Sequence, residues 1–563
     1  MISIFADAQS SIAQIIKNAF AAAAAAGELP DAAPADFVVE VPADTAKGDF
    51  ATNAAMVNAK AMRLAPVKIA QLLSAHFVLE GTEVERCEIA GPGFINFFMQ
   101  PSWFGRIVGE VAEKGDRYGR SDYGKGKKVM VEYVSANPTG PMHMGNARGG
   151  AIGDVLAEAM DWSGHDTTRE FYVNDAGNQI EKFGISLEAR YIQQLQGEDA
   201  IEFPEDAYHG ADIIEHAKAF IEIYGDKYLS CDSRTRKDAL IGYALPKNID
   251  NLKRDLGRYR IDYDMWFKES TLYPDAVEAV LKVLRDRGMA YEQEGALWYK
   301  ATDFGAEKDE VLVRANGFPT YFAADIAYHY NKFAVRGFDK VINVWGADHH
   351  GHVARLKGAM DAVGLSGDKL DIVLMQLVRL MKDGEPYRMS KRSGKSITLT
   401  DLLDEVPLDA ARFFFIMREP GSPLDFDLDL AVEESSKNPV FYVQYAHARI
   451  CSLLKNLAAE GISPRPVATA DFAALTTPEE RELIRRLGQL PQEIIAAAKG
   501  YDPAKISGYV SDVATLFHKF YTACRVKGEP DELLYPRLAL CEATKTVIRN
   551  CLALLKITAP EVM

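Results

Sequence analysis

The feature that most constrains the fold is a strand, a loop, a helix and a second strand in consecutive order. An apolar run at residues 129–134 is followed by a loop rich in proline and glycine, and then by a helical pattern over residues 145–162. Residues 168–173 are typical of the next strand. This order predicts a βαβ unit, whose two strands lie parallel in one sheet. Residues 340–345 predict a further buried strand, and we expect the sheet to resume near Ala323.

The length and the pattern together predict several domains. A chain of 563 residues suggests about three or four domains. We expect a small α+β domain over residues 1–115 and a central domain over residues 120–437, with a helical insertion at about 185–300. Residues 438–563 predict a helical bundle. The predicted fold class is therefore an α/β, Rossmann-like parallel-sheet catalytic domain with an N-terminal α+β domain and a C-terminal all-α helical bundle.

The composition excludes several classes of protein. A formal net charge of −16 argues against a protein that coats nucleic acid with a basic surface, although a local basic groove remains compatible with it. The six cysteines form no C-x-x-C pair, which disfavours a zinc ribbon and is typical of reduced thiols in a cytosolic protein. Asp7 and Lys17 interrupt any signal peptide, and no stretch is apolar enough to span a membrane. We therefore expect a cytoplasmic protein with no membrane partner.

The loop of the βαβ unit holds the first candidate site. Gly145 allows the backbone to approach a ligand closely, and the start of the following helix offers unpaired N–H groups to phosphates. His143, just before that helix, can donate a hydrogen bond to a phosphate as its charge develops. The alternative interpretation is an ordinary turn that happens to hold a histidine. The loop consists of Ala136, Asn137, Pro138, Thr139, Gly140, Pro141, Met142, His143, Met144, Gly145 and Asn146.

A basic stretch provides the second candidate site. Lys391 is a mobile point charge suited to a leaving pyrophosphate, whereas the alternative is a solvated basic loop. Residues 394–396 do not complete a P-loop, because the first glycine of that motif would fall at Met389. The stretch consists of Arg388, Met389, Ser390, Lys391 and Arg392.

The third candidate site follows the predicted strand at residues 340–345. Asp348, His349, His350 and His352 are possible metal ligands, but ligands at adjacent positions rarely face the same way. Because no distant cysteine or glutamate cluster completes a site, we expect no structural metal. Loops at the carboxyl ends of parallel strands bind ligands, which favours a nucleotide or substrate role.

A tyrosine and an aspartate form the fourth candidate. Tyr321 and Asp325 stand four residues apart and share one face of a helix. Together they can clasp a guanidinium group, which prefers carboxylate partners. On spacing alone, a helix-capping or surface aspartate beside a core tyrosine is the favoured explanation of the pattern.

Taken together, these stretches resemble the arginyl-tRNA synthetases of the bacterial type, a family of class I aminoacyl-tRNA synthetases. Residues 136–146 resemble that family's version of the HIGH signature, and residues 388–392 resemble its KMSKS signature. The resemblance covers nearly the whole chain. The other stretches that carry it are residues 47–53 and 90–96 for the N-terminal domain, 172–178 and 346–351 for the catalytic domain, and 439–449 for the entry to the anticodon-binding domain.

The resemblance implies ATP-dependent attachment of L-arginine to its tRNA through an arginyl-adenylate. The resemblance assigns His143 and Lys391 to catalysis. It also implies that ATP is used with Mg²⁺ and that arginine activation requires tRNA. Asn146 stands where the second histidine of the HIGH signature often is, and Arg388 replaces the first lysine of KMSKS. The implied ATP-binding residues are His143, Gly145, Asn146, Met389, Ser390 and Lys391, and the implied arginine-binding residues are Glu132, Ser135, Asn137, Tyr321, Asp325 and His349.

Three other functions remain open at this point, and a monomer is expected. The first is a class I synthetase for another amino acid, whose pocket would not need Asp325. The second is a tRNA-binding paralogue without activation, against which the joint presence of His143, Lys391, Tyr321 and Asp325 argues. The third is a plain nucleotidyltransferase, which would not need the long helical tail.

Overall fold

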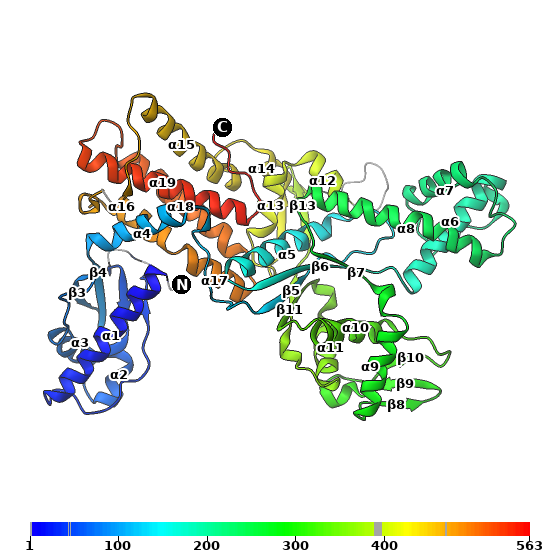
Figure 1. Ribbon diagram of the computed structural model, residues 1–563, viewed down its shortest axis with the longest axis horizontal. Helices are drawn as coiled ribbons and strands as arrows, with labels where there is room; N and C mark the ends of the chain where they lie inside the picture. The colour runs from blue at the N-terminus through cyan, green and yellow to red at the C-terminus, as the bar shows by residue number, and fades with distance from the viewer. Residues whose placement is uncertain (1–2, 43, 45–46, 388–396, 468–469) are drawn as a thin grey trace.

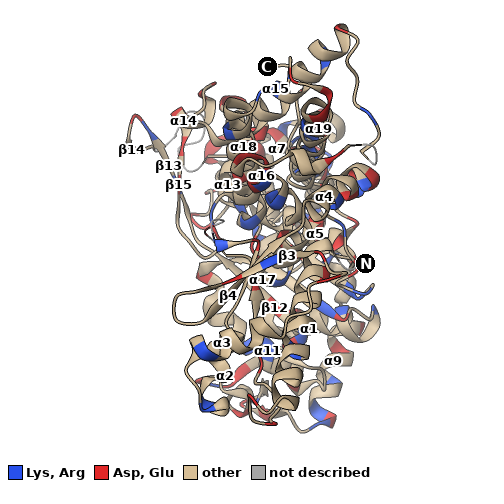
Figure 2. Ribbon diagram, turned by 90° about the vertical axis from the view of Figure 1, so that its left-hand side faces the viewer, with Lys and Arg blue, Asp and Glu red and all other residues tan. Residues whose placement is uncertain are grey.

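The computed structural model describes residues 3–42, 44, 47–387, 397–467 and 470–563. Figure 1 shows an elongated molecule, in which the N-terminal unit and the C-terminal helices lie at one end and the main sheet lies in the middle. Helices α6 (Asn178–Gln196) and α7 (Ala211–Tyr224) lie at the opposite end. In Figure 2, basic and acidic residues are interspersed over the elements that face the viewer.

The N-terminal unit is an antiparallel sheet covered by helices. Its strands run in the order β1-β2-β4-β3. The first helix is amphipathic: Ile12 and Ile16 are fully buried, and the Ser3 side chain accepts a hydrogen bond from Ala6 N at the helix start. The elements of this unit are α1 (Ile4–Ala25), β1 (Val39–Glu40), β2 (Phe50–Thr52), α2 (Ala54–Met62), α3 (Pro66–Ala75), β3 (Val84–Ala90), β4 (Phe94–Met99) and α4 (Pro101–Lys114).

The central unit is built on a parallel sheet of five strands in the order β12-β11-β5-β6-β7. Every neighbouring pair in it is parallel. Helix α5 connects β5 to β6, so the predicted βαβ unit and parallel sheet are confirmed. These elements are β5 (Lys128–Glu132), α5 (Met144–Trp162), β6 (Asp166–Val173), β7 (Met265–Lys268), β11 (Lys340–Gly346) and β12 (Leu370–Met375).

The segment expected to be a helical insertion at about 185–300 contains strands as well as helices in its second part. Helices α6, α7 and α8 (Ser233–Arg258) share a separate core that includes Phe183 and Phe220. The chain then joins the main sheet as β7 and forms a second, antiparallel sheet in the order β10-β9-β8. The sequence pattern missed these strands because each is only four residues long, too short to display a period. The remaining elements here are α9 (Asp275–Asp286), β8 (Ala290–Gln293), β9 (Ala296–Tyr299) and β10 (Glu310–Val313).

Ala323 lies in a helix and not in a strand, so the main sheet resumes only at β11. Helix α10 (Tyr321–Tyr330) begins after Thr320, whose side chain accepts a hydrogen bond from Ala323 N at 3.4 Å. Helix α11 (His350–Ala362) follows β11 and contacts α10. The short apolar run around Ala323 was ambiguous, because buried helices and buried strands both lack a polar face.

The C-terminal part is helical, and the three parts together confirm the predicted fold class. A small sheet in the order β14-β13-β15 leads into it. Among the described residues, no helix is long and apolar enough to cross a membrane. The elements are β13 (Val378–Lys382), β14 (Glu385–Pro386), α12 (Leu399–Glu405), α13 (Leu408–Ile416), β15 (Leu424–Asp427), α14 (Leu428–Val432), α15 (Pro439–Ala459), α16 (Pro478–Gly488), α17 (Leu490–Gly500), α18 (Ala504–Ala523) and α19 (Asp531–Leu554).

One hydrophobic core joins the three parts. It runs without interruption from Ile12 in α1 through Leu156 in α5 to Leu552 in α19. A buried ion pair adds to this junction, since Asp49 of the N-terminal unit accepts a hydrogen bond from Arg485 of α16 at 2.8 Å. Burial raises the pKa of the Asp49 carboxyl despite the opposing charge of Arg485. The N-terminal unit is therefore packed firmly onto the C-terminal helices.

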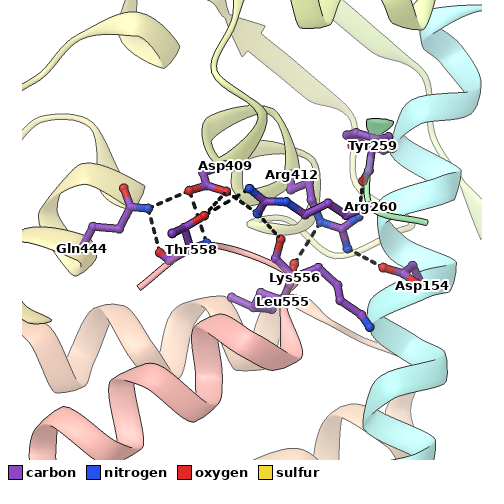
Figure 3. Close-up of polar contacts among 9 residues, drawn as sticks. All are labelled: Asp154, Tyr259, Arg260, Asp409, Arg412, Gln444, Leu555, Lys556 and Thr558. Atoms are coloured by element: carbon purple, nitrogen blue, oxygen red, sulfur yellow. Dashed lines mark hydrogen bonds and ion pairs between the residues drawn. The ribbon is translucent and has the colours of Figure 1, made fainter. Parts of the chain in front are cut away.

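A polar junction connects α5 to the C-terminal segment (Figure 3). Arg412 of α13 is fully buried and donates to Asp154 Oδ2 at 2.5 Å, Tyr259 O at 2.8 Å and Leu555 O at 3.0 Å. Each donor group of its guanidinium thus reaches a different segment. Next to it, Arg260 donates to Asp409, to Lys556 O and to Thr558, and Gln444 of α15 donates to Asp409 and to Thr558 O.

Candidate active site

The candidate residues gather at the carboxyl edge of the parallel sheet, where open α/β sheets bind their ligands. Glu132 is the last residue of β5, Tyr172 lies at the end of β6, and Glu269 follows directly on β7. Beyond β11 come residues 347–349, and α11 then begins at His350. Because these strands are parallel neighbours, their ends bring together side chains that are far apart in the sequence.

The loop of residues 136–146 lies between β5 and α5. His143 is the N-cap residue of α5, with extended backbone angles, and its carbonyl accepts a hydrogen bond from Asn146 N at 3.0 Å. The His143 side chain is exposed, as are Asn137 and Gly145. A β-carbon at Gly145 would meet no other atom within 4 Å, so a ligand can reach the backbone at the helix start.

This loop is held in place from both sides. Met142 and Met144 are buried, as Pro138 and Thr139 also are, and they anchor the loop in the core. Met144 N donates to Ile397 O at 2.8 Å, and Leu399 N donates to Met142 O at 2.9 Å. The predicted residues Met389, Ser390 and Lys391 lie outside the described residues, together with Arg388 and Arg392. The chain that follows them, from Ile397, therefore pairs directly with the strand-like end of the His143 loop.

The Glu132 carboxylate has hydrogen-bond donors within the protein for both of its oxygens. Its carboxylate accepts from Ser135 Oγ at 2.9 Å and from Lys332 Nζ at 2.5 Å, and Lys332 is fully buried. Ser135 Oγ in turn accepts from Tyr172 N at 3.1 Å. Ser135 has a positive φ of 43°, a strained backbone conformation that is typical of functional sites. The negative charge of Glu132 is thus balanced within the protein.

Tyr321 and Asp325 lie one turn apart on α10, as predicted. The Tyr321 hydroxyl accepts a hydrogen bond from Asn178 N at 2.9 Å, at the start of α6, and the residue is 41% exposed. The Asp325 side chain is 36% exposed, and its Oδ2 lies 3.1 Å from His352 Nε2. Both side chains therefore combine a fixed position with access from the solvent.

Glu269 is a candidate residue that the sequence analysis missed. Burial raises the pKa of this carboxyl to about 7. Hydrogen bonds from Tyr172 and Tyr273 oppose the rise, whereas the negative charges of Asp325 and Asp175 add to it. In the part of the chain that the structure describes, no lysine or arginine forms an ion pair with Glu269 or with Asp325. Among the described residues, these two carboxyl groups thus make an acidic site without a lysine or arginine partner.

Tyr172 is influenced by three carboxyl groups of the site. Burial raises the pKa of its phenol above the ordinary value, and so do the charges of Glu269, Asp325 and Glu132. Its ring packs against Tyr328 with a centroid distance of 4.4 Å. The phenol of Tyr172 is therefore within electrostatic reach of Glu132 on β5 and of both Glu269 and Asp325.

His349 differs from its neighbours in the segment 346–352. Its side chain is 60% exposed and lies 3.7 Å from that of Asp348, whereas His352 points toward Asp325. The His349 ring lies 5.9 Å from the Trp345 ring, at the open rim of the site. Among the described residues, no group of three or more histidine, cysteine, aspartate or glutamate side chains is arranged to hold a metal ion.

A second surface with candidate function lies on α15 and α18. The Arg449 guanidinium lies 5.1 Å from the centroid of Tyr445 and 4.7 Å from that of Tyr521. The ring of His518 stacks on Tyr445 at 6.0 Å, and burial, with the charge of Arg449, lowers the pKa of that histidine. Tyr445 is partly exposed. Aromatic faces beside an arginine are typical of surfaces that stack on single-stranded bases.

Models of known protein families match three consecutive parts of the chain and together cover nearly all of it. An arginyl-tRNA synthetase N-terminal domain matches residues 8–99, the catalytic domain of class I (R) tRNA synthetases matches residues 108–419, and a DALR anticodon-binding domain matches residues 443–563. Arginine–tRNA ligase of Acetivibrio thermocellus is 53% identical, and that of Ruminiclostridium cellulolyticum 54% identical, over 100% of both chains in each case.

Solved structures support the same relationship. A crystal structure of an arginyl-tRNA synthetase from Campylobacter jejuni superposes with a TM-score of 0.75 at 34% identity, over 83% of this chain and 100% of that chain. Arginyl-tRNA synthetase of Thermus thermophilus superposes with a TM-score of 0.73 over 99% of this chain and 100% of that chain. At 21% identity, the latter similarity bears on the fold alone.

Proposed function

This chain belongs to the class I arginyl-tRNA synthetases, and on that basis we propose how its residues attach arginine to tRNA. The chain is an arginine–tRNA ligase that uses ATP, and its C-terminal helices form a DALR anticodon-binding domain. Membership of this family sets aside a class I enzyme for another amino acid and a nucleotidyltransferase without a tRNA substrate.

The charge distribution of the pocket carries the proposal for arginine. Asp325 and Glu269 have no cation partner among the described residues, and they would bind the guanidinium with Tyr321 beside them. Glu132 is already neutralised by Lys332. The part of the pocket around Glu132 therefore has no net charge, like the zwitterionic α-amino and α-carboxyl groups of the amino acid. Glu132, Ser135 and Asn137 would bind those groups. His349 would line the outer edge of the arginine pocket.

The N-terminus of α5 supports the proposal for ATP. The start of this helix, with its positive dipole end and the accessible backbone of Gly145, would receive the phosphates, and His143 and Asn146 would lie at the contact. The arginine carboxylate oxygen attacks the α-phosphorus of ATP, and the bond to the bridging oxygen breaks as pyrophosphate leaves. His143 would donate to the developing charge, and Lys391, with Ser390 and Met389, would hold the pyrophosphate. ATP would be used as its Mg²⁺ complex, in which the ion shields the negative phosphate oxygens from the incoming carboxylate.

The second step transfers the arginyl group to tRNA. A ribose hydroxyl of the terminal adenosine attacks the carbonyl carbon of the adenylate, and AMP leaves with the bonding electrons. The aromatic group of Tyr445, Arg449, His518 and Tyr521 would stack on anticodon bases. The N-terminal unit would contact the outer corner of the tRNA. We further propose that the enzyme works in the cytoplasm as a monomer and that arginine activation requires bound tRNA.

Exchange of labelled pyrophosphate into ATP tests this proposal. All twenty amino acids are assayed with and without total tRNA, and we expect exchange only with arginine and only when tRNA is present. An Asp325→Asn variant should raise the arginine KM by about tenfold or more, because a charge-assisted hydrogen bond is lost. An unchanged KM would remove Asp325 from the pocket. The absence of exchange from a folded enzyme under all conditions would indicate an inactive tRNA-binding paralogue.

A further inference from the structure

We propose that His352 is a positioning residue for arginine recognition, which fixes the orientation of the Asp325 carboxylate from behind. The inference rests on the proposed function, in which Asp325 binds the guanidinium. His352 is the third residue of α11, on the helix that packs beside α10. Its histidine-rich segment suggested a ligand site in the sequence, and the structure turns this one ring away from the rim and toward Asp325.

The geometry determines which nitrogen of His352 carries the proton. Arg355 Nη2 is within hydrogen-bond distance of His352 Nδ1, and a guanidinium has only N–H donors. Nδ1 must therefore accept, and the proton of the neutral ring lies on Nε2. Because Nε2 is 3.1 Å from Asp325 Oδ2, His352 donates to the carboxylate and leaves Oδ1 for the substrate.

The surroundings prevent this ring from turning. The His352 ring lies 5.5 Å from the Trp345 ring and meets the edge of Phe322 at 5.7 Å. Only 17% of the His352 side chain is exposed. Arg355 is itself fixed, because its Nη1 donates to Glu310 Oε1 at 2.8 Å and its guanidinium lies 4.9 Å from the centroid of Phe322. Glu310, Arg355, His352 and Asp325 thus form a continuous line of hydrogen bonds.

The charges of the residues behind Asp325 matter for substrate binding. Glu310 balances the charge of Arg355, and a neutral His352 orients Asp325 without cancelling its negative charge. A lysine or arginine in the same place would pair with Asp325 and compete with the guanidinium of the substrate. The arrangement therefore supplies orientation and retains the attraction for arginine, which is the condition for a preorganised carboxylate.

Two substitutions separate the two hydrogen bonds of the ring. In His352→Gln, the amide nitrogen has the same reach as Nε2 and can still donate to Asp325. In His352→Asn, the amide oxygen can replace Nδ1 as the acceptor for Arg355, but no donor reaches Asp325. We expect His352→Asn to raise the arginine KM about tenfold with kcat and the ATP KM within about twofold of wild type, and His352→Gln to stay within about threefold.

The test is steady-state aminoacylation by the full-length enzyme with arginine, ATP and tRNA varied in turn, with thermal unfolding as a check of folding. Asp325→Asn and the double variant His352→Asn/Asp325→Asn complete a cycle. If His352 acts only through Asp325, the double variant has the arginine KM of Asp325→Asn alone.

Equal arginine KM values for wild type, His352→Asn and His352→Gln would overturn the proposal, as would full additivity in the cycle. A general loss in which the ATP KM rises equally would also overturn it, because a purely structural role has that signature. An arginine KM that Asp325→Asn leaves unchanged would instead refute the role of Asp325 itself, so the two failures are distinguishable.

Discussion

Glu269 allows the strongest quantitative prediction, because its pKa of about 7 lies close to neutral pH. Only the ionised carboxylate attracts a guanidinium, so arginine affinity should increase as the pH rises through this value. With that pKa, about one tenth of the groups are ionised at pH 6 and about nine tenths at pH 8. The dissociation constant for arginine should therefore fall about tenfold between these two pH values, with about half a proton released per arginine bound at pH 7.

Isothermal titration calorimetry of arginine binding measures both quantities, since proton release appears as a dependence of the heat on the ionisation enthalpy of the buffer. Glu269→Gln should bind arginine about tenfold more weakly at pH 8 and show no pH dependence between pH 6 and 8. The matched control is Glu292→Gln, an exposed carboxylate in the small antiparallel sheet, which should keep the wild-type slope. The reasoning is refuted if wild-type affinity is flat across this range. It is equally refuted if Glu269→Gln retains the slope, because another group would then be the one that titrates.

Three other substitutions test separate parts of the molecule. Lys391→Ala should lower arginine-dependent pyrophosphate exchange about 100-fold or more and change tRNA affinity less than about threefold; equal losses would make this lysine a tRNA contact. Arg412→Met should cost about 3–5 kcal/mol in the free energy of unfolding measured with urea, because Asp154 is left buried without its partner, and a cost below about 1 kcal/mol contradicts this account. Tyr445→Ala should weaken tRNA binding by about 1–3 kcal/mol in a filter assay and leave arginine affinity unchanged; unaltered tRNA binding would exclude Tyr445 from the tRNA surface.

The sequence predicted the parts of the fold that depend on local pattern and order. The strand, loop, helix and strand at residues 129–173 required a parallel sheet, and the structure has it. Strand β7 escaped prediction because four residues cannot display a period, and because its pairing with β6 is a tertiary contact across more than 90 residues, from Phe171 to Trp266. Local propensity does not determine which sheet such a short segment joins.

The same limit explains which site residues the sequence could suggest. Tyr321 and Asp325 were candidates because one helix face holds both, and His143 because it precedes a helix start. Glu269 had no such signal, since its importance comes from its place at the end of an unpredicted strand and from burial without a lysine or arginine partner in the described part of the chain. The neutralisation of Glu132 by Lys332 was equally inaccessible, because 200 residues separate the two partners.

The position of α5 links these local features to the whole molecule. At its start, the loop of His143 pairs with residues 397–399. Farther along, Asp154 is held by Arg412, which also holds the carbonyl of Leu555 in the C-terminal segment (Figure 3). Moving α5 relative to the C-terminal helices would break a buried ion pair and open the shared hydrophobic core, which costs several kcal/mol. We therefore expect the helix start proposed to receive ATP to stay fixed relative to the anticodon-binding domain, so that tRNA binding acts on the catalytic loops through a rigid frame.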